Sequence, residues 1–92
     1  MRSKNHKALT TAERDHLERV KEMHCGLCQH EPPSSAHHIR QGDHWTVIPL
    51  CWHCHQGRDG WHGTKALWRV RKADELSVLS STVRELLNAK AR

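Results

Sequence analysis

The chain of 92 residues contains no Phe and no Tyr, and four Trp are its only large aromatic side chains. Because aromatic side chains bury the most apolar surface, their scarcity predicts a thin core. A domain of this length buries only about 60% of the surface that its unfolded chain exposes. Small domains of this kind usually need a further stabiliser, such as a structural metal ion. We therefore expect one small domain that depends on bound metal.

Long apolar runs are also missing from the sequence. A transmembrane helix needs about 20 consecutive apolar residues, so none is expected. The basic residues near the N-terminus are not followed by the apolar segment of a signal peptide. We expect residues 1–10 to be a flexible basic N-terminus, residues 11–92 to form a single domain, and the protein to be cytoplasmic.

Acidic residues are outnumbered, with 10 Asp and Glu against 15 Lys and Arg, which gives a net charge of +5. A basic small domain suits a polyanionic partner, and nucleic acid is the first candidate. The four cysteines carry more specific information, because disulfides are rare in the cytoplasm. Cysteines of a cytoplasmic protein are more often metal ligands or catalytic groups.

The cysteines form two Cys-x-x-Cys motifs, Cys25–Cys28 and Cys51–Cys54, with 22 residues between them. Each motif can bring two thiolates to one ion, and two motifs complete the tetrahedron that Zn²⁺ accepts. A redox role would need a βαβ context, which the sequence lacks. The motifs therefore predict a structural zinc site. In an alternative site a nearby histidine replaces one cysteine, and the candidates are His24, His30 and His53.

Four of the histidines around the second cysteine motif are candidates for a second site, namely His37, His38, His55 and His62. His37 and His38 are adjacent, so in an extended segment they point to opposite sides. His55 directly follows Cys54, and His62 follows a glycine-rich turn that could fold it back. The imidazoles of His37, His55 and His62 could hold one divalent ion with open positions for phosphate oxygen and water. Histidine ligands favour Zn²⁺, Ni²⁺ or Mn²⁺ over Mg²⁺.

His38 remains as a candidate general base, because a histidine can accept a proton from water at neutral pH. Asp43 and Asp59 are close enough in sequence to join the metal shell, although they are weaker candidates. We interpret three further histidines as alternative ligands, solvated polar groups or phosphate contacts; they are His6, His16 and His44.

Local patterns predict an α+β fold. Thr10 and Glu13 form a capping-box pattern at the start of a helix over about 11–23. Two extended segments follow at 36–40 and 44–50, with Pro49 expected to end their pairing. A short helix over about 51–56 comes next, and Thr64 and Asp74 could cap one or two later helices. The apolar face expected for the last helix consists of Leu76, Leu79, Val83, Leu86 and Leu87.

The motif Ala36-His37-His38-Ile39, followed by Pro49-Leu50-Cys51-x-x-Cys54-His55, resembles the pattern of the HNH, or ββα-metal, endonucleases. The resemblance implies a zinc-stabilised, treble-clef-like ββα-metal core flanked by N- and C-terminal helices. It implies that His37 binds a catalytic divalent ion, which would be Mg²⁺, Mn²⁺, Ni²⁺ or Zn²⁺. It also implies that His38 is the general base and that His55 matches the histidine at the start of the family's helix.

Further segments are similar to the phage recombination-enhancement family of Ref-like, RecA-dependent nucleases; they are His16–Lys21, Pro33–Ile39, Gly60–Gly63, Trp68–Lys72 and Asp74–Leu76. This similarity covers roughly residues 16–87. It implies a DNA endonuclease of phage or prophage origin that acts in recombination or DNA processing, with a RecA-type filament as a further partner.

Basic residues around these motifs are candidates for contact with DNA phosphates, and the competing interpretation is a solvated surface. They are Arg40, Arg58, Lys65, Arg69, Arg71 and Lys72. A zinc-stabilised DNA-binding module without catalysis would need the cysteines and the basic surface but not His38. A zinc domain that binds another protein is a third class. We expect a monomer, or a weak homodimer formed through the C-terminal helix.

Overall fold

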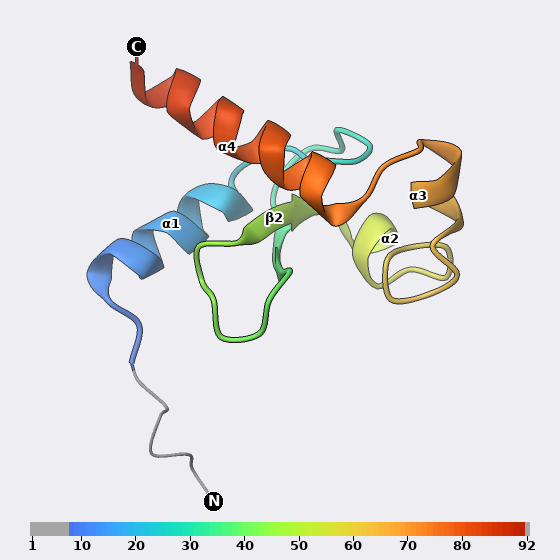
Figure 1. Ribbon diagram of the computed structural model, residues 1–92, viewed down its shortest axis with the longest axis horizontal. Helices are drawn as coiled ribbons and strands as arrows, with labels where there is room; N and C mark the ends of the chain where they lie inside the picture. Colours follow the sequence, from blue (N-terminus) through green and yellow to red (C-terminus); the bar gives the residue numbers. More distant parts are fainter. Residues whose placement is uncertain (1–7, 92) are drawn as a thin grey trace, which may run out of the picture.

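The computed structural model describes residues 8–91, so most of the expected flexible N-terminus, residues 1–7, lies outside the described residues. The chain has an α+β fold with a two-stranded antiparallel sheet and helices before and after it (Figure 1). In chain order the elements are α1 (Thr11–Lys21), β1 (Ser35–His38), β2 (Val47–Leu50), α2 (Trp52–His55), α3 (Ala66–Val70) and α4 (Glu75–Ala91).

Helix α1 begins at the predicted capping box. The Glu13 N–H donates to Thr10 Oγ1 at 3.0 Å, and the Thr10 N–H donates to Glu13 Oε1 at 2.9 Å. Both bonds satisfy N–H groups that a helix start otherwise leaves unpaired. The helix ends at Lys21, two residues before the expected boundary, and buries Val20.

Strand β1 pairs with β2 so that His37 lies opposite Ile48 and His38 lies opposite Val47. Both strands are shorter than predicted, and the prediction that Pro49 ends the pairing is wrong because Pro49 lies opposite Ala36. The physical reason is the alternation of the ladder. The Ile39 N–H donates to the Thr46 carbonyl, so the Ala36–Pro49 pair falls at a non-hydrogen-bonded position where proline loses no ladder bond.

Side-chain alternation along β2 divides the core into two clusters. Val47 packs with Val20 and Met23 beside α1. Ile48 and Leu50 point to the other face, where they form a cluster with the buried cysteines, Trp68 of α3 and Val78 of α4. All four residues of β2 are buried, because helices cover both faces of this short strand.

The C-terminal third contains two helices, α3 and α4, which resolves the alternatives left open by the sequence. Asp74 caps α4 as predicted, since its Oδ1 accepts the Ser77 N–H at 2.8 Å. The predicted apolar face of α4 is only partly correct: Leu79 and Leu86 pack against the core, whereas Leu76 is 68% exposed and Leu87 is 63% exposed. Val78 and Thr82 are buried, with Leu79 and Leu86 half-buried beside them.

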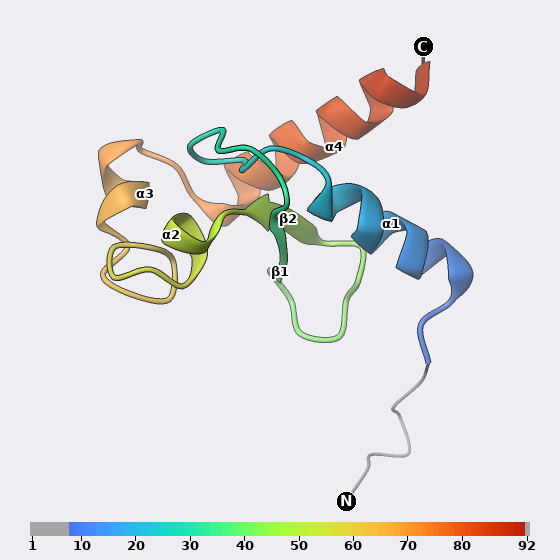
Figure 2. The same cartoon turned by 180° about the vertical axis from the view of Figure 1, so that it is seen from behind.

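Figures 1 and 2 show the arrangement from opposite sides. Helix α1 lies at one end of the sheet, and α2 and α3 lie at the other, while α4 runs across β2. Helix α2 follows β2 directly and contacts both strands. This places the start of α2 beside the end of β2, where the second cysteine motif lies. No helix within residues 8–91 is long and apolar enough to cross a membrane.

Candidate metal centres

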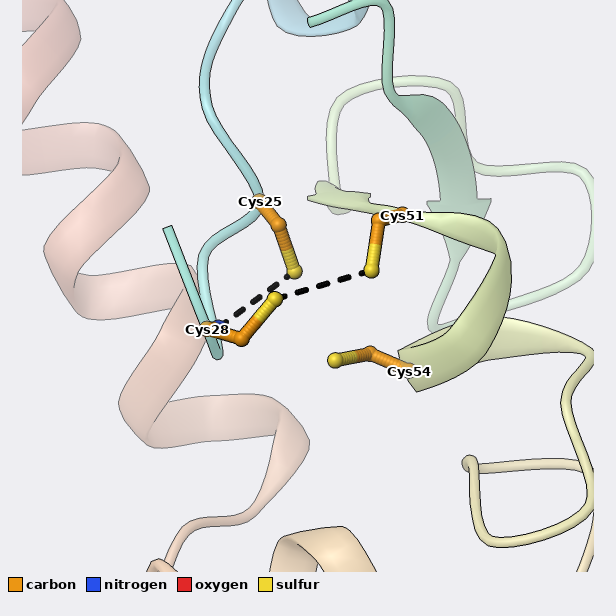
Figure 3. Close-up of side chains that lie close together, drawn as sticks. All are labelled: Cys25, Cys28, Cys51 and Cys54. Atoms are coloured by element: carbon orange, nitrogen blue, oxygen red, sulfur yellow. Dashed lines mark hydrogen bonds between the residues drawn. The ribbon is translucent and has the colours of Figure 1, made fainter. Parts of the chain in front are cut away.

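The four cysteines converge from two separate segments, one between α1 and β1 and the other at the junction of β2 and α2 (Figure 3). Their Sγ atoms all lie within 4.8 Å of one another. The Sγ atoms of Cys28 and Cys51 are 3.6 Å apart. Tetrahedral zinc with Zn–S bonds of about 2.3 Å requires sulfur atoms about 3.8 Å apart, so this spacing fits. The four cysteines could therefore hold a structural ion such as Zn²⁺.

The surroundings of the cysteines favour ionisation of one thiol, Cys25, and oppose ionisation of another, Cys54. Burial acts to raise the pKa of Cys25, but the backbone N–H groups of Cys28, Cys51 and Leu27 outweigh it and lower that pKa to about 7. The Leu27 and Cys28 N–H groups donate to Cys25 Sγ at 3.4 and 3.5 Å. Burial and the charge of Cys25 raise the pKa of Cys54. Four adjacent thiolates repel one another, so a cation is needed before all of them can ionise.

The alternative of a histidine replacing one cysteine is not what the structure forms. His24, His30 and His53 are all exposed, and none belongs to the group of ligand atoms around the cysteines. The ligand set within residues 8–91 is the four cysteines alone.

The first cysteine turn is held against the sheet and α4. The Gly26 N–H donates to the Pro49 carbonyl at 2.8 Å. A Cβ at Gly26 would lie 2.5 Å from Val78 Cγ1, which is closer than side chains approach. Only glycine fits at this point, so the turn packs directly on the first turns of α4.

The three predicted histidine ligands form a second group. The structure brings His37 of β1, His55 at the end of α2 and His62 of the following loop together, with ring nitrogens within 4.8 Å of one another. His37 Nδ1 and His55 Nε2 are 3.1 Å apart. Nitrogen ligands at about 2.0–2.1 Å from a tetrahedral ion lie about 3.3 Å apart, so this group also has the spacing of a metal site. His37 is buried, whereas His62 is exposed, so the group opens to solvent on one side.

The loop that carries His62 is fixed to α2 through its backbone. The Trp61 N–H donates to the Cys54 carbonyl at 2.8 Å, and the His62 N–H donates to the His55 carbonyl at 3.0 Å. This approach requires Gly60, because a Cβ there would lie 2.5 Å from the His53 carbonyl oxygen. The glycine-rich turn therefore folds His62 back toward His55.

Burial also keeps His55 in the neutral form that binds metal. It lowers the pKa of His55 to about 4, with the charges of His37 and His62 adding to the effect. Its imidazole is therefore unprotonated at neutral pH and can offer a lone pair. The other ring nitrogen of His55, Nδ1, is buried and has no hydrogen-bond partner among residues 8–91.

His38, the predicted general base, lies outside this group. Its Nε2 is 3.0 Å from His44 Nδ1, and no partner within residues 8–91 engages its Nδ1. Burial lowers the pKa of His38, and the charges of His44 and His37 lower it further. His44 is half-buried, and it packs against the predicted base. The ring of His16 lies against that of Trp45, with centroids 4.9 Å apart and planes tilted by 38°.

Neither aspartate considered from the sequence joins the metal groups. Asp43 accepts a hydrogen bond from the Trp45 N–H, and Asp59 accepts one from Thr64 Oγ1. Both carboxylates stabilise local turns. The acidic residue that does reach the site is Glu75, whose Oε2 lies 2.6 Å from His37 Nε2. The sequence carried no signal for this contact, because the two residues are 38 positions apart.

The candidate DNA contacts are distributed around the loop and α3. Lys65 is half-buried, with its Nζ 4.7 Å from the centre of the Trp61 ring. The other five are exposed and make no ion pair with an acidic residue of 8–91: Arg40, Arg58, Arg69, Arg71 and Lys72. Their charges are therefore available to a polyanion.

Comparisons of the chain with protein-family models, with curated proteins and with solved structures found no match. The resemblance to HNH endonucleases thus stays a prediction that rests on the motifs themselves.

Proposed function

We propose that the protein is a metal-dependent DNA endonuclease with a ββα-metal core of the HNH type. The observation that carries the proposal is the convergence of His37, His55 and His62 on one group that opens to solvent. Four cysteines already account for a structural ion, so stabilising the fold does not require a second set of ligands. Three imidazoles with one open side suit an ion that must also bind phosphate oxygen and water.

The chain's own residues would divide the chemistry among them. When bound, a divalent ion would supply Lewis-acid stabilisation of the negative charge that develops on the scissile phosphate and the leaving 3′ oxygen. His37, His55 and His62 would hold this ion and fix its position. His38 accepts the proton of the attacking water at its free Nδ1. His44 engages the other nitrogen of that ring at 3.0 Å and restricts its rotation.

Exposed basic side chains would position the DNA backbone. Arg58 lies in the loop that carries His62, and Arg40 follows β1 by two residues. These two would contact phosphates near the scissile bond, and Lys65 would add a third charge. The basic residues at the end of α3 would extend the contact along the duplex; they are Arg69, Arg71 and Lys72.

The wider setting follows from the resemblance and is part of the proposal. The enzyme would be of phage or prophage origin, would act in DNA recombination or processing in the cytoplasm, and would work with a RecA-type filament. It would be a monomer or a weak homodimer. The exposed Leu76, Val83 and Leu87 of α4 offer an apolar surface for the second state.

A plasmid-nicking assay tests the proposal. Purified zinc-loaded protein is incubated with supercoiled DNA and added Mg²⁺, Mn²⁺, Ni²⁺ or Zn²⁺, and the nicked product is measured over time. We expect cleavage with at least one ion, and a loss of about 10²–10⁴-fold in the His38→Ala variant, the range for removing a general base.

His30→Ala is the matched control, because His30 is exposed and belongs to neither metal group. It should cleave at the wild-type rate. If His38→Ala cleaves as fast as the wild type, the assignment of the base is wrong. If no ion supports cleavage of supercoiled, linear or single-stranded DNA, and the protein binds DNA nevertheless, the non-catalytic zinc-stabilised binding module replaces the nuclease.

A further inference from the structure

Glu75 contacts one member of the histidine group, His37. It meets the ring nitrogen of His37 that does not face His55. Its Oε2 lies 2.6 Å from His37 Nε2, while the other nitrogen of the same ring, Nδ1, faces His55 Nε2 at 3.1 Å. The side chains of His37 and Glu75 are 6% and 19% exposed, so water competes little for this contact. A charged hydrogen bond this short is among the stronger contacts in proteins.

The contact fixes which nitrogen of His37 carries its proton. A carboxylate only accepts hydrogen bonds, so His37 Nε2 must be the donor. In the neutral ring the lone pair then lies on Nδ1, the atom that faces His55 and the rest of the group. We propose that Glu75 is a positioning residue that presents Nδ1 of His37 as a metal ligand. This inference rests on the proposed metal site.

The three ligands differ in their outer contacts. His37 has Glu75, whereas the outer nitrogen of His55 is buried without a partner within residues 8–91. His62 is exposed to solvent. Outer carboxylates raise the basicity of a ligating imidazole and hold its ring, and their loss typically lowers metal affinity by about 10–100-fold. His37 is therefore the ligand through which the protein sets the affinity of this site.

Glu75 is held in place by packing that belongs to the four-cysteine half of the molecule. It is the first residue of α4, directly after the Asp74 cap. One turn later, Val78 is buried in the cluster that contains Cys25 and Cys54. The backbone that carries the carboxylate is thus held by packing that does not involve the histidine group.

Titration of the full-length, zinc-loaded protein with Co²⁺ tests the inference without any cleavage assay. Binding of the second ion is followed by visible absorption, which gives its dissociation constant. The protonated nitrogen of His37 is identified by ¹⁵N NMR before metal is added. We expect Glu75→Ala to weaken the binding of Co²⁺ by about 10–100-fold and to remove the preference for a proton on Nε2. Glu75→Gln keeps an acceptor but loses the charge, so its effect should be smaller.

Glu85→Gln is the matched control, because it removes the same charge from an exposed position of the same helix. It should bind Co²⁺ like the wild type. Equal Co²⁺ affinity in Glu75→Ala and wild type would overturn the role of Glu75 alone. If the wild type itself binds no second ion, the histidine metal site fails and the role of Glu75 fails with it. If Co²⁺ binds and depends on Glu75 but no DNA is cleaved, this inference stands and the nuclease does not.

Discussion

The four-cysteine site and the three-histidine site share one short helix and differ in what surrounds them. Cys54 and His55 are consecutive residues of α2, so their side chains project about 100° apart around its axis. Cys54 points into a buried cluster, whereas His55 meets His62, which is exposed. The comparison teaches that one helical turn can support a closed site suited to stabilising the fold and an open site suited to ligand exchange.

We expect the largest effect from removing a ligand of the four-cysteine site. Cys25→Ser should abolish folding, because structural zinc in small domains contributes about 10–16 kcal/mol and a domain of this size has little other stability. Far-UV circular dichroism and zinc content by atomic absorption measure the result. His24→Ala changes an exposed neighbour and should keep both zinc and fold. A folded Cys25→Ser protein without zinc would show that the core does not depend on the thiolate site.

Removing a ligand of the three-histidine site should leave the fold intact. His62→Ala removes an exposed ligand, so we expect the second ion to bind at least 10–100-fold more weakly while structural zinc and thermal stability stay unchanged. Isothermal titration with Ni²⁺ and a thermal melt measure the two quantities. His53→Ala should change neither, because His53 lies on α2 outside both groups. A drop in melting temperature in His62→Ala would mean that the two sites are not separable.

A smaller effect sharpens the account of how the closed site is packed. Gly26→Ala places a methyl group 2.5 Å from Val78 Cγ1, so the free energy of unfolding should fall by about 1–3 kcal/mol. Urea denaturation measures it. Adding Val78→Ala removes the contacted atom, so the double variant should be more stable than the sum of the single effects predicts. If the two single effects simply add in the double variant, the contact with Val78 is not what destabilises Gly26→Ala.

The smallest effect concerns the surface around the three-histidine site that is proposed to bind DNA. Arg58→Ala should weaken binding to DNA and lower the slope of log affinity against log salt concentration by about 1, as expected when one phosphate contact is lost. Fluorescence anisotropy at several salt concentrations measures the slope. Arg14→Ala, on the exposed side of α1, should leave it unchanged. An unchanged slope in Arg58→Ala would remove that residue from the interface.

The features that the sequence predicted correctly are set either by near neighbours or by the several ligands that one ion requires. The Thr10–Glu13 capping box and the Asp74 cap depend on residues three positions apart, and both form. The two Cys-x-x-Cys motifs also predicted a four-cysteine group. The caps need no knowledge of tertiary packing, because short-range geometry is fixed by the backbone. The cysteine group was predictable because two thiolates from one motif are too few for a tetrahedral ion.

The features that the sequence did not predict depend on tertiary packing. Pro49 remains in β2 because of the ladder register, which the residue itself does not reveal. Helix α4 buries Val78 and Thr82 and leaves Leu76 exposed, because only a narrow line of the helix meets the small core. The contact of Glu75 with His37 joins two distant elements that only the packing of α4 brings together.

The backbone hydrogen bonds from Trp61 and His62 to the carbonyls of Cys54 and His55 imply an order in which the two sites form. The loop has nothing to attach to until α2 exists, and α2 is anchored by the cysteines. We therefore expect a fixed order of metal delivery, with the thiolate ion first and the ion of the histidine group second. Chains made when zinc is scarce would then lack both sites together, and not the histidine site alone.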